Sequence, residues 1–489
     1  MDRRLSVGMD QDHPRVTIVG GGISGLAAAY RLTRYLDGRL ITLVEANSRL
    51  GGKISTEHIG EFIIESGPDS FLAAKPRGIG LAAEVGLRDD LIAVTPRGHR
   101  AYVLWRNRLH ELPEGLTGLV PTRLGPLARS SLLSPIGKAR AAADYLIPAR
   151  ELSEDEPLGG FIRRRLGAEA WERLVEPLMA GIYAADGDAL SLMATFPQLR
   201  LAEQTHGSLI RGVLANRKHS ATDQAPKPAF LTPKLGLSQL VEALTERLSL
   251  AGVTILTDAP VVSITGSPGA FELELERGPT ISTAAVILAV PAFIAGDLVS
   301  GLDSALANEL RAIPYSSTAI VTFAFRGDHL RHPLDAHGYV VPRAMGGPIL
   351  ACTWSSRKWR HRAPQGWELI RVFLGRTGQD DILAADDHAL VRVARDELGT
   401  RLGIGAPPDL LRVQRWPRGM PQYLLGHRER VKRIEELAGT VPGLFLASNA
   451  LYGVGIPDAI ASGEKAADAV GLSYQESSRR SSRAVSADR

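Results

Sequence analysis

The ordered part of the chain begins with two short apolar runs on either side of a helix-like stretch. Residues 16–19 and 40–44 are rich in Val, Ile and Leu, which is typical of strands buried on both faces of a parallel sheet. Residues 23–36 have the apolar spacing of a helix. The order strand, helix, strand predicts the first unit of an α/β domain.

The apolar spacing then changes. Residues 54–64 alternate like an edge hairpin, and 102–105 and 109–112 predict a second hairpin. From about 113 to 215 the pattern is helical and is divided by prolines, which predicts a helical insertion.

The second half of the chain mixes strands and helices and ends as the chain began. An amphipathic helix is predicted over 237–250, and 285–290 is a fully apolar strand. A strand at 444–447, a glycine turn and a helix from 457 to about 470 predict that the end of the chain completes its first domain. The other predicted elements are strands at meander spacing (253–256, 260–265, 271–276, 280–282), strands at 319–325 and 369–373, and a helix over 386–398.

Composition excludes several classes of protein. With 489 residues, 44% of them hydrophobic, the chain has material for two or three domains. Its net charge is only +4 and no basic tract carries interleaved aromatics, so nucleic acid is not an expected partner. The single cysteine, Cys352, excludes an intrachain disulfide. Neither H-E-x-x-H nor a glycine-framed serine occurs, so we expect no metal and no acyl-enzyme.

The chain has no apolar run long enough to span a membrane and no apolar signal core at its start. We therefore expect a cytoplasmic protein, with peripheral membrane contact left open. Met9 is an alternative start to Met1. Residues Arg163 to Arg165 are interpreted as a solvated helix face, with a membrane-surface patch as the alternative.

The strongest chemical motif is G-x-G-x-x-G at Gly20, Gly22 and Gly25. This spacing supplies a tight turn, a close backbone approach to a pyrophosphate and close packing of the helix on its strand. The helix that starts at Ile23 and Ser24 directs its amides at the phosphate. Glu45, at the end of the second strand, is placed to accept ribose hydroxyls.

Two further glycine turns extend this site. Arg49, Gly51, Gly52 and Lys53 offer amides and cations to a pyrophosphate that stays bound, which favours a flavin over a nicotinamide; an ordinary turn is the alternative. Near the end of the chain, Gly453 and Gly455 precede a helix whose N-terminus could stabilise negative charge on a reduced flavin.

The motifs occur in the order G-x-G-x-x-G, E-x-x-x-R-x-G-G, R-W-x-x-x-M-P-Q-Y-x-x-G-H-x-x-R and Y-G-V-G-I-P-D. This order resembles the FAD-dependent protoporphyrinogen/coproporphyrinogen oxidases of haem synthesis, in the amine-oxidase-like flavoprotein superfamily, over residues 14–472. The resemblance places Val262 near the adenine, Trp416 near the flavin and Arg100 on a substrate propionate, with a surface arginine as the alternative for Arg100. The expected FAD contacts are Gly20, Gly22, Ile23, Ser24, Gly25, Glu45, Ala46, Arg49, Gly51, Gly52, Lys53, Gly67, Pro68, Val262, Trp416, Gly455, Ile456 and Pro457.

The expected fold is a discontinuous, Rossmann-like α/β FAD-binding domain with an α+β substrate domain and a helical insertion. Residues 14–95, 226–298 and 440–472 would form the first, 96–112 and 299–439 the second, and 113–225 the insertion, which faces a membrane if membrane contact occurs. Residues 1–13 and 473–489 are expected to be disordered.

The resemblance implies a six-electron oxidation of a porphyrinogen, either coproporphyrinogen III or protoporphyrinogen IX, with oxygen as acceptor and hydrogen peroxide as product. An amine oxidase is the first alternative, although Trp416 is the only evident member of the aromatic pair that it would need. A flavin-binding escort without turnover is the second. Whether the protein is a homodimer stays open. Tyr423 and His427, in the R-W-x-x-x-M-P-Q-Y motif, are assigned either to the site or to packing and hydrogen bonding.

Overall fold

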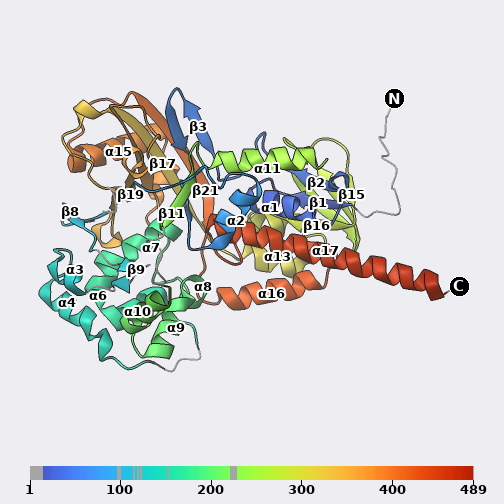
Figure 1. The fold of residues 1–489 in the computed structure, drawn as a ribbon, viewed down its shortest axis with the longest axis horizontal. Helices are drawn as coiled ribbons and strands as arrows, with labels where there is room; N and C mark the ends of the chain where they lie inside the picture. Colours follow the sequence, from blue (N-terminus) through green and yellow to red (C-terminus); the bar gives the residue numbers. More distant parts are fainter. Residues whose placement is uncertain are drawn as a thin grey trace.

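The computed structural model describes residues 15–95, 101–113, 116–117, 120–121, 124–150, 154–220 and 228–487. Two sheets lie side by side, and a helical part lies below them in the view of Figure 1. The first and last helices of the chain, α1 (Ile23–Leu32) and α17 (Ile456–Ala487), pack against each other in the same domain. The predicted combination of α/β, α+β and helical parts is confirmed.

A parallel five-stranded sheet in the order β12-β2-β1-β16-β22 forms the centre of the first domain. Its side chains alternate between two cores. Val16 and Ile18 of β1 join the core of α1, α11 and α17, whereas Val19 joins the core of α12, α13 and α16. Burial on both faces explains why these strands read as continuous apolar runs. The strands are β1 Val16–Val19, β2 Ile41–Val44, β12 Thr254–Leu256, β16 Ala285–Leu288 and β22 Leu444–Leu446; the remaining helices are α2 Pro76–Glu84, α11 Ser238–Leu250, α12 Ala292–Leu298, α13 Ser304–Arg311 and α16 His427–Gly439.

Three small antiparallel sheets surround this domain. The predicted hairpin is β3 (Thr56–Ile59) and β4 (Phe62–Glu65). The meander holds three strands, not four, because β12 pairs in parallel with β2 and leaves the meander to β13 (Val261–Ser267), β14 (Ala270–Leu275) and β15 (Ile281–Thr283). The third sheet joins β5 Phe71–Leu72, β11 Phe230–Pro233 and β6 Leu91–Ala93.

The larger sheet has seven strands in the order β21-β17-β20-β19-β18-β7-β8. Its edge hairpin, β7 and β8, comes from the first quarter of the chain and turns through Arg106 and Asn107, both at positive φ. Parallel pairing of β7 with β18 brings this early segment into the late sheet. The elements are β7 Tyr102–Trp105, β8 Arg108–Glu111, β17 Tyr315–Arg326, β18 Gly338–Val340, β19 Ile349–Trp354, β20 Trp367–Leu374, β21 Leu410–Pro421, α14 Ser355–Lys358 and α15 Asp387–Leu402.

The helical part has its own apolar core, which includes Phe161 and Trp171. One turn, Trp171–Val175, is a π-helix. Within the described residues, no helix combines the length and apolarity needed to cross a membrane. The other elements are β9 Leu116–Thr117, β10 Val120–Pro121, α3 Leu124–Arg129, α4 Pro135–Ala142, α5 Leu158–Leu166, α6 Ala168–Ala170, α7 Glu176–Tyr183, α8 Leu192–Thr195, α9 Pro197–His206 and α10 Leu209–Ser220.

The prediction that the three consecutive arginines of α5 lie on one solvated face is wrong. Arg165 is completely buried and pairs with Asp144 and Glu203, while Arg164 reaches Glu203 as well. Arg163 is the most exposed of the three, with 38% of its side-chain surface accessible, and it pairs with Asp188. Neither a solvated face nor a membrane patch describes this segment, because successive helix positions point in different directions.

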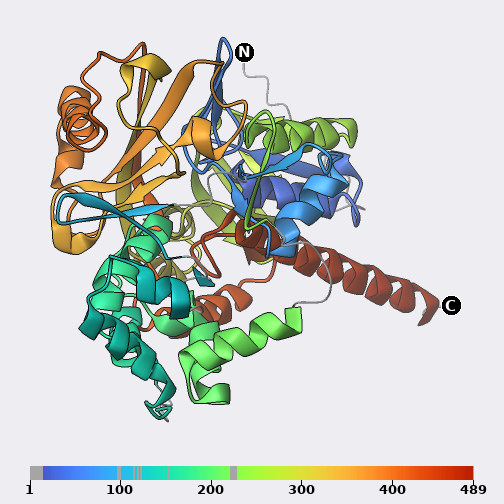
Figure 2. The same cartoon turned by 60° about the vertical axis from the view of Figure 1, so that its left-hand side comes forward.

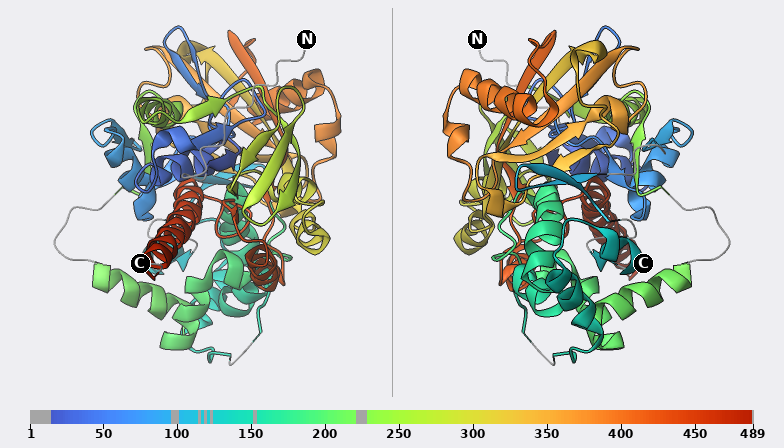
Figure 3. Two further views of the ribbon diagram at one scale, coloured as in Figure 1. Left: turned by 90° about the vertical axis from the view of Figure 1, so that its right-hand side faces the viewer. Right: turned by 90° about the vertical axis from the view of Figure 1, so that its left-hand side faces the viewer.

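The closing helix is longer than predicted. Its backbone continues from Ile456 to Ala487, so the disorder expected for 473–489 is wrong for residues 473–487. The end of α17 projects beyond the body of the protein in Figures 1 and 2, and Figure 3 shows the helix nearly end-on. Apolar periodicity is absent there, and the helix is an uninterrupted extension of its packed first half.

Candidate functional site

The first glycine turn follows β1 and leads directly into α1. Gly20 has a φ of +108°, and a Cβ there would lie 2.6 Å from the Ala289 carbonyl oxygen. A Cβ at Gly25 would lie 1.9 Å from the Gly20 carbonyl oxygen, so the close packing of helix on strand requires glycine. At Gly22, by contrast, a Cβ would meet no atom within 4 Å. Gly22 therefore borders open space at the N-terminus of α1, where a phosphate would bind.

Glu45 lies beside this turn. It directly follows β2 and is only 7% exposed. Its Oε2 accepts the Gly21 amide at 2.7 Å, and its Oε1 accepts the backbone and side-chain N–H groups of Asn47 at 2.9 and 2.6 Å. The carboxylate is thus held in place by the same loop that borders the open space.

The second glycine pair meets the first. The Gly51 amide donates to the Gly21 carbonyl at 2.8 Å, and Gly51 bridges with Gly22. Gly51 and Gly52 have φ values of +100° and +57°, and a Cβ at Gly52 would lie 3.2 Å from the Gly22 Cα. This contact excludes an ordinary isolated turn for the pair.

Arg49 and Lys53, the charged residues on either side of Gly51 and Gly52, differ in their surroundings. Arg49 donates to the carbonyls of Leu50, Gly52 and Ile54, so its guanidinium fixes the loop. Lys53 is partly buried, and burial lowers its pKa. Ala46 and Arg49 are exposed on the outer side of the turn.

The loop after β4 joins the same region. A Cβ at Gly67 would lie 2.1 Å from the Lys53 carbonyl oxygen and 3.6 Å from the Trp416 ring. The Trp416 indole donates to the Ser66 carbonyl at 2.8 Å. Trp416 is therefore brought to the loop that holds Gly67 and Pro68.

Buried charges behind this loop were not found from the sequence. Asp69 accepts Lys358 Nζ at 2.9 Å, and Arg371, which is buried in β20, donates to the Gly67 carbonyl. Burial opposes the charge of Asp69, but Lys358 and Arg371 hold the pKa of its carboxyl well below the usual range. Glu65 pairs similarly with Arg362. A charged residue within an apolar strand, as at Arg371, was the available signal.

The closing glycine turn is organised by the R-W-x-x-x-M-P-Q-Y motif. The Tyr423 hydroxyl accepts the Gly453 amide at 2.7 Å and donates to the Asn449 carbonyl. His427 stacks on the Tyr423 ring with centroids 4.1 Å apart and contacts the Leu451 carbonyl at 3.3 Å. The motif therefore positions residues 449–453. In this structure Tyr423 and His427 serve in packing and hydrogen bonding.

The start of α17 is fixed by further contacts. Asp458 accepts the Gly455 amide at 3.2 Å and pairs with Lys75. Farther along, a Cβ at Gly463 would lie 2.0 Å from the Ser24 carbonyl oxygen, so α17 crosses the beginning of α1 in direct backbone contact. Gly455, Ile456 and Pro457 thus begin a helix that is anchored on the first glycine turn.

His427 makes a pH-dependent prediction. Burial lowers the pKa of the imidazole to about 4. The unfolded chain takes up this proton below about pH 6.5 and the folded chain resists it down to about 4, so stability should fall as the pH falls through that window. The change in the free energy of unfolding across this window is roughly 3 kcal/mol. Chemical unfolding between pH 7 and 4 should show a steeper loss for the wild type than for His427→Gln; parallel curves would contradict this assignment.

Val262 lies at an irregularity of β13. The pairing of β13 with β14 shifts register between Val261 and Ser263, and the Val262 side chain is 48% exposed. The Ala259 amide donates to the Glu45 backbone carbonyl at 3.0 Å, so the segment that leads into β13 lies beside Glu45. Arg100, the predicted propionate ligand, lies outside the described residues.

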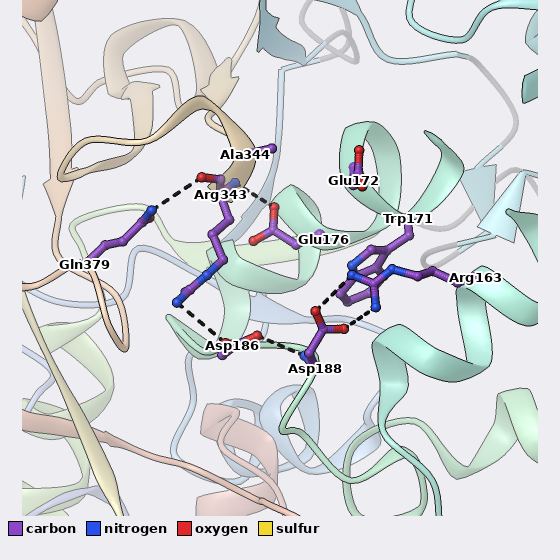
Figure 4. Close-up of a pocket in the computed structure, with 9 residues that line it drawn as sticks. All are labelled: Arg163, Trp171, Glu172, Glu176, Asp186, Asp188, Arg343, Ala344 and Gln379. Carbon is purple, nitrogen blue, oxygen red and sulfur yellow. Dashed lines mark hydrogen bonds and ion pairs between the residues drawn. The ribbon is translucent and has the colours of Figure 1, made fainter. Parts of the chain in front are cut away.

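A separate cavity of about 310 Å³ lies between the helical part and the seven-stranded sheet, and Figure 4 shows its walls. Arg163 pairs with Asp188 beside Trp171, while the Arg343 amide donates to Glu176 at 2.9 Å. None of its lining residues is an expected cofactor contact. The residues that line it are Arg163, Trp171, Glu172, Glu176, Asp186, Asp188, Arg343, Ala344 and Gln379.

A family model described as flavin containing amine oxidoreductase matches residues 23–471. Coproporphyrinogen III oxidase of Bacillus subtilis (strain 168) is 38% identical over 474 residues, covering 95% of this chain and 99% of the relative. The chloroplastic protoporphyrinogen oxidase of Oryza sativa subsp. japonica is 32% identical, covering 90% and 84%.

Solved structures agree in fold. A structure from Exiguobacterium sp. 255-15, for which a protoporphyrinogen oxidase activity has been suggested, is 35% identical with a TM-score of 0.84, covering 94% of this chain and 99% of that one. Putrescine oxidase bound to putrescine is 16% identical with a TM-score of 0.65, covering 94% and 98%, which shows a shared fold alone.

Proposed function

Because the chain belongs to the flavin-containing amine oxidoreductase family, on the branch of the porphyrinogen oxidases, we propose that it is an FAD-dependent porphyrinogen oxidase of haem synthesis. The observation that carries the proposal is the open space at Gly22, on which the two glycine turns converge. Glu45 and the start of α1 border the same space.

The residues present fit FAD. Gly20 to Gly25 and the first amides of α1 would hold the pyrophosphate, with Gly51, Gly52 and Lys53 beside them. Glu45 would accept ribose hydroxyls, and the backbone at Val262 would contact the adenine. Gly67, Pro68, Trp416 and the start of α17 would border the flavin ring.

When bound, the flavin supplies the acceptor for the electrons that leave the substrate. The protein's part is to orient the porphyrinogen and to neutralise its carboxylates. In the overall reaction the porphyrinogen loses six electrons and six protons to three molecules of oxygen, which become hydrogen peroxide. Oxygen as acceptor and the role of Arg100 remain predictions from the sequence, and a homodimer and peripheral membrane contact stay open.

Side-by-side turnover of coproporphyrinogen III and protoporphyrinogen IX, followed by porphyrin fluorescence and oxygen uptake, tests the proposal. Turnover of either substrate by yellow protein supports it and shows the preference. Flavin-containing protein that oxidises neither would favour the escort alternative. Oxidation of an amine instead would favour an amine oxidase, but Tyr423 is committed to Asn449 and Gly453 and is a poor candidate for its aromatic pair.

Glu45→Ala should weaken FAD binding by about tenfold to a hundredfold. It removes the ribose acceptor, a charged hydrogen bond worth roughly 1.5–3 kcal/mol. It also leaves the Gly21 amide and Asn47 without their carboxylate. Flavin retained after dialysis is the measurement, with Glu57→Ala as control because Glu57 pairs with Arg412 on the surface. Equal retention by both variants would contradict the role of Glu45.

A further inference from the structure

Arg418 has an unusual backbone in the middle of a strand. Its φ is +46°, in the left-handed region that L-residues rarely adopt, although it lies within β21. The pairing of β21 with β17 shifts register here: Ser316 faces Met420 and Thr318 faces Trp416. Three residues of β21 thus oppose Ser317 alone. Bulges of this kind redirect a side chain and are frequent beside active sites.

The bulge is built into the fold. The Arg418 amide donates to the Ser317 hydroxyl at 2.9 Å. A Cβ at Gly419 would lie 2.9 Å from the Trp416 Cβ, so the chain turns tightly between these residues. The left-handed conformation is therefore maintained by neighbouring contacts, and it sets where the Arg418 side chain points.

Within the part of the chain that the structure describes, the Arg418 guanidinium has an aromatic neighbour and no acidic partner. Its Cζ lies 3.8 Å from the centre of the Phe293 ring. Among the described residues, no ion pair or side-chain hydrogen bond of Arg418 is recorded, and the residue is exposed. A guanidinium stacked on a ring keeps its edge N–H groups available for a planar anion.

Both ends of this contact border the cofactor site. Phe293 lies in α12, three residues after Val290, whose side chain would be 2.9 Å from a Cβ at Gly20. Phe293 also packs at 5.0 Å on Tyr315, whose hydroxyl accepts the Ala292 amide. On the other side, Trp416 reaches the Ser66 to Gly67 loop. The segments that carry Phe293 and Arg418 thus each contact one of the two loops proposed to border the cofactor, through Val290 and Trp416.

We propose that Arg418 binds a carboxylate of the substrate at the edge of the flavin site. The inference rests on the proposed function, since a porphyrinogen carries propionate groups, and an exposed guanidinium can pair with a carboxylate. A carboxylate can accept two N–H groups of a guanidinium at once, which a single ammonium cannot match. Substrate binding then depends on the bulge as well as on the charge.

The test compares Arg418→Gly and Arg418→Lys with the wild type. Glycine accepts the left-handed backbone, so Arg418→Gly should melt at the wild-type temperature or above it. Its KM for coproporphyrinogen III should rise by about tenfold to a hundredfold, with kcat nearly unchanged, because an ionic contact present throughout the reaction is lost. Arg418→Lys should restore part of the affinity. The Kd for coproporphyrin III, read by fluorescence, should follow KM.

Arg412→Gly is the matched control. Arg412 is exposed on the same strand but is already paired with Glu57 at 3.0 Å, so its loss should leave KM unchanged. An unchanged KM in Arg418→Gly would show that Arg418 is a surface arginine that does not bind the substrate, and would overturn the proposal. Loss of flavin from that variant would assign the arginine to a cofactor phosphate and overturn the proposal. If the wild type turns over no porphyrinogen, the proposed function and this inference both fail. If the wild type is active and the Arg418 variants have an unchanged KM, only this inference fails.

Discussion

Gly22→Val is expected to purify as a folded, colourless protein. No protein atom lies within 4 Å of a Cβ at this position, so the valine side chain finds room in the apoprotein. The same room is where the pyrophosphate must approach the backbone. A bound cofactor cannot move away as a side chain can, and overpacking costs about 1–3 kcal/mol even where the surroundings relax. Flavin absorbance and turnover should be lost together, while circular dichroism stays unchanged.

Gly160→Val is the matched control. Gly160 is exposed on α5, and its Cβ would also meet nothing within 4 Å. This variant should stay yellow. Gly25→Val should differ from both, because a Cβ 1.9 Å from the Gly20 carbonyl oxygen disturbs the fold itself. A yellow, active Gly22→Val enzyme would refute the assignment of the cofactor site.

Arg165→Met should destabilise the helical part by about 3–5 kcal/mol, the usual effect of removing one partner from a buried ion pair. Arg165 is fully buried and donates to Asp144 and to the carbonyls of Ile147 and Gly207. Without it, the Asp144 carboxylate stays buried with fewer donors. Urea unfolding, followed by tryptophan fluorescence and by proteolysis, should show the helical part opening at lower urea concentration.

Arg163→Met is its control, two positions away on the same helix. Arg163 pairs with Asp188 at the surface, and such pairs contribute about 0–1 kcal/mol. Adding Asp144→Leu to Arg165→Met should recover part of the lost stability, because the orphaned charge is removed as well. Equal effects of Arg163→Met and Arg165→Met would show that burial does not set the contribution of Arg165.

The cofactor unit could be predicted because its signals are local. Gly20, Gly22, Gly25 and Glu45 follow one another within thirty residues, and their spacing alone determines a turn, a helix start and an acceptor. The same holds for the hairpin at β7 and β8, where Arg106 and Asn107 adopt the positive φ of a tight turn. Here local preference and tertiary structure agree.

The remaining features depend on partners distant in sequence. Nothing near Arg165 shows that Asp144 and Glu203 will surround it, and nothing near β12 shows that it pairs with β2 and not with the meander. Arg371 and Asp69 are about three hundred positions apart, and Arg418 and Phe293 are more than one hundred apart. Such contacts are decided by topology, which the pattern along the chain does not contain.

Because α17 packs across α1, the first domain can be completed only when the end of the chain has been synthesised. Gly463 lies against Ser24, and β22 pairs in the sheet that β1 begins, so the first domain is built from both ends of the chain. At about 5–20 residues per second, the strand at Val16 waits roughly 20–90 s on the ribosome for the helix at Ile456. On the proposed function, FAD would therefore bind only after synthesis is complete. A chain truncated before α17 contains the first glycine turn but lacks the helix that packs across α1. We therefore expect only the full-length protein to be yellow.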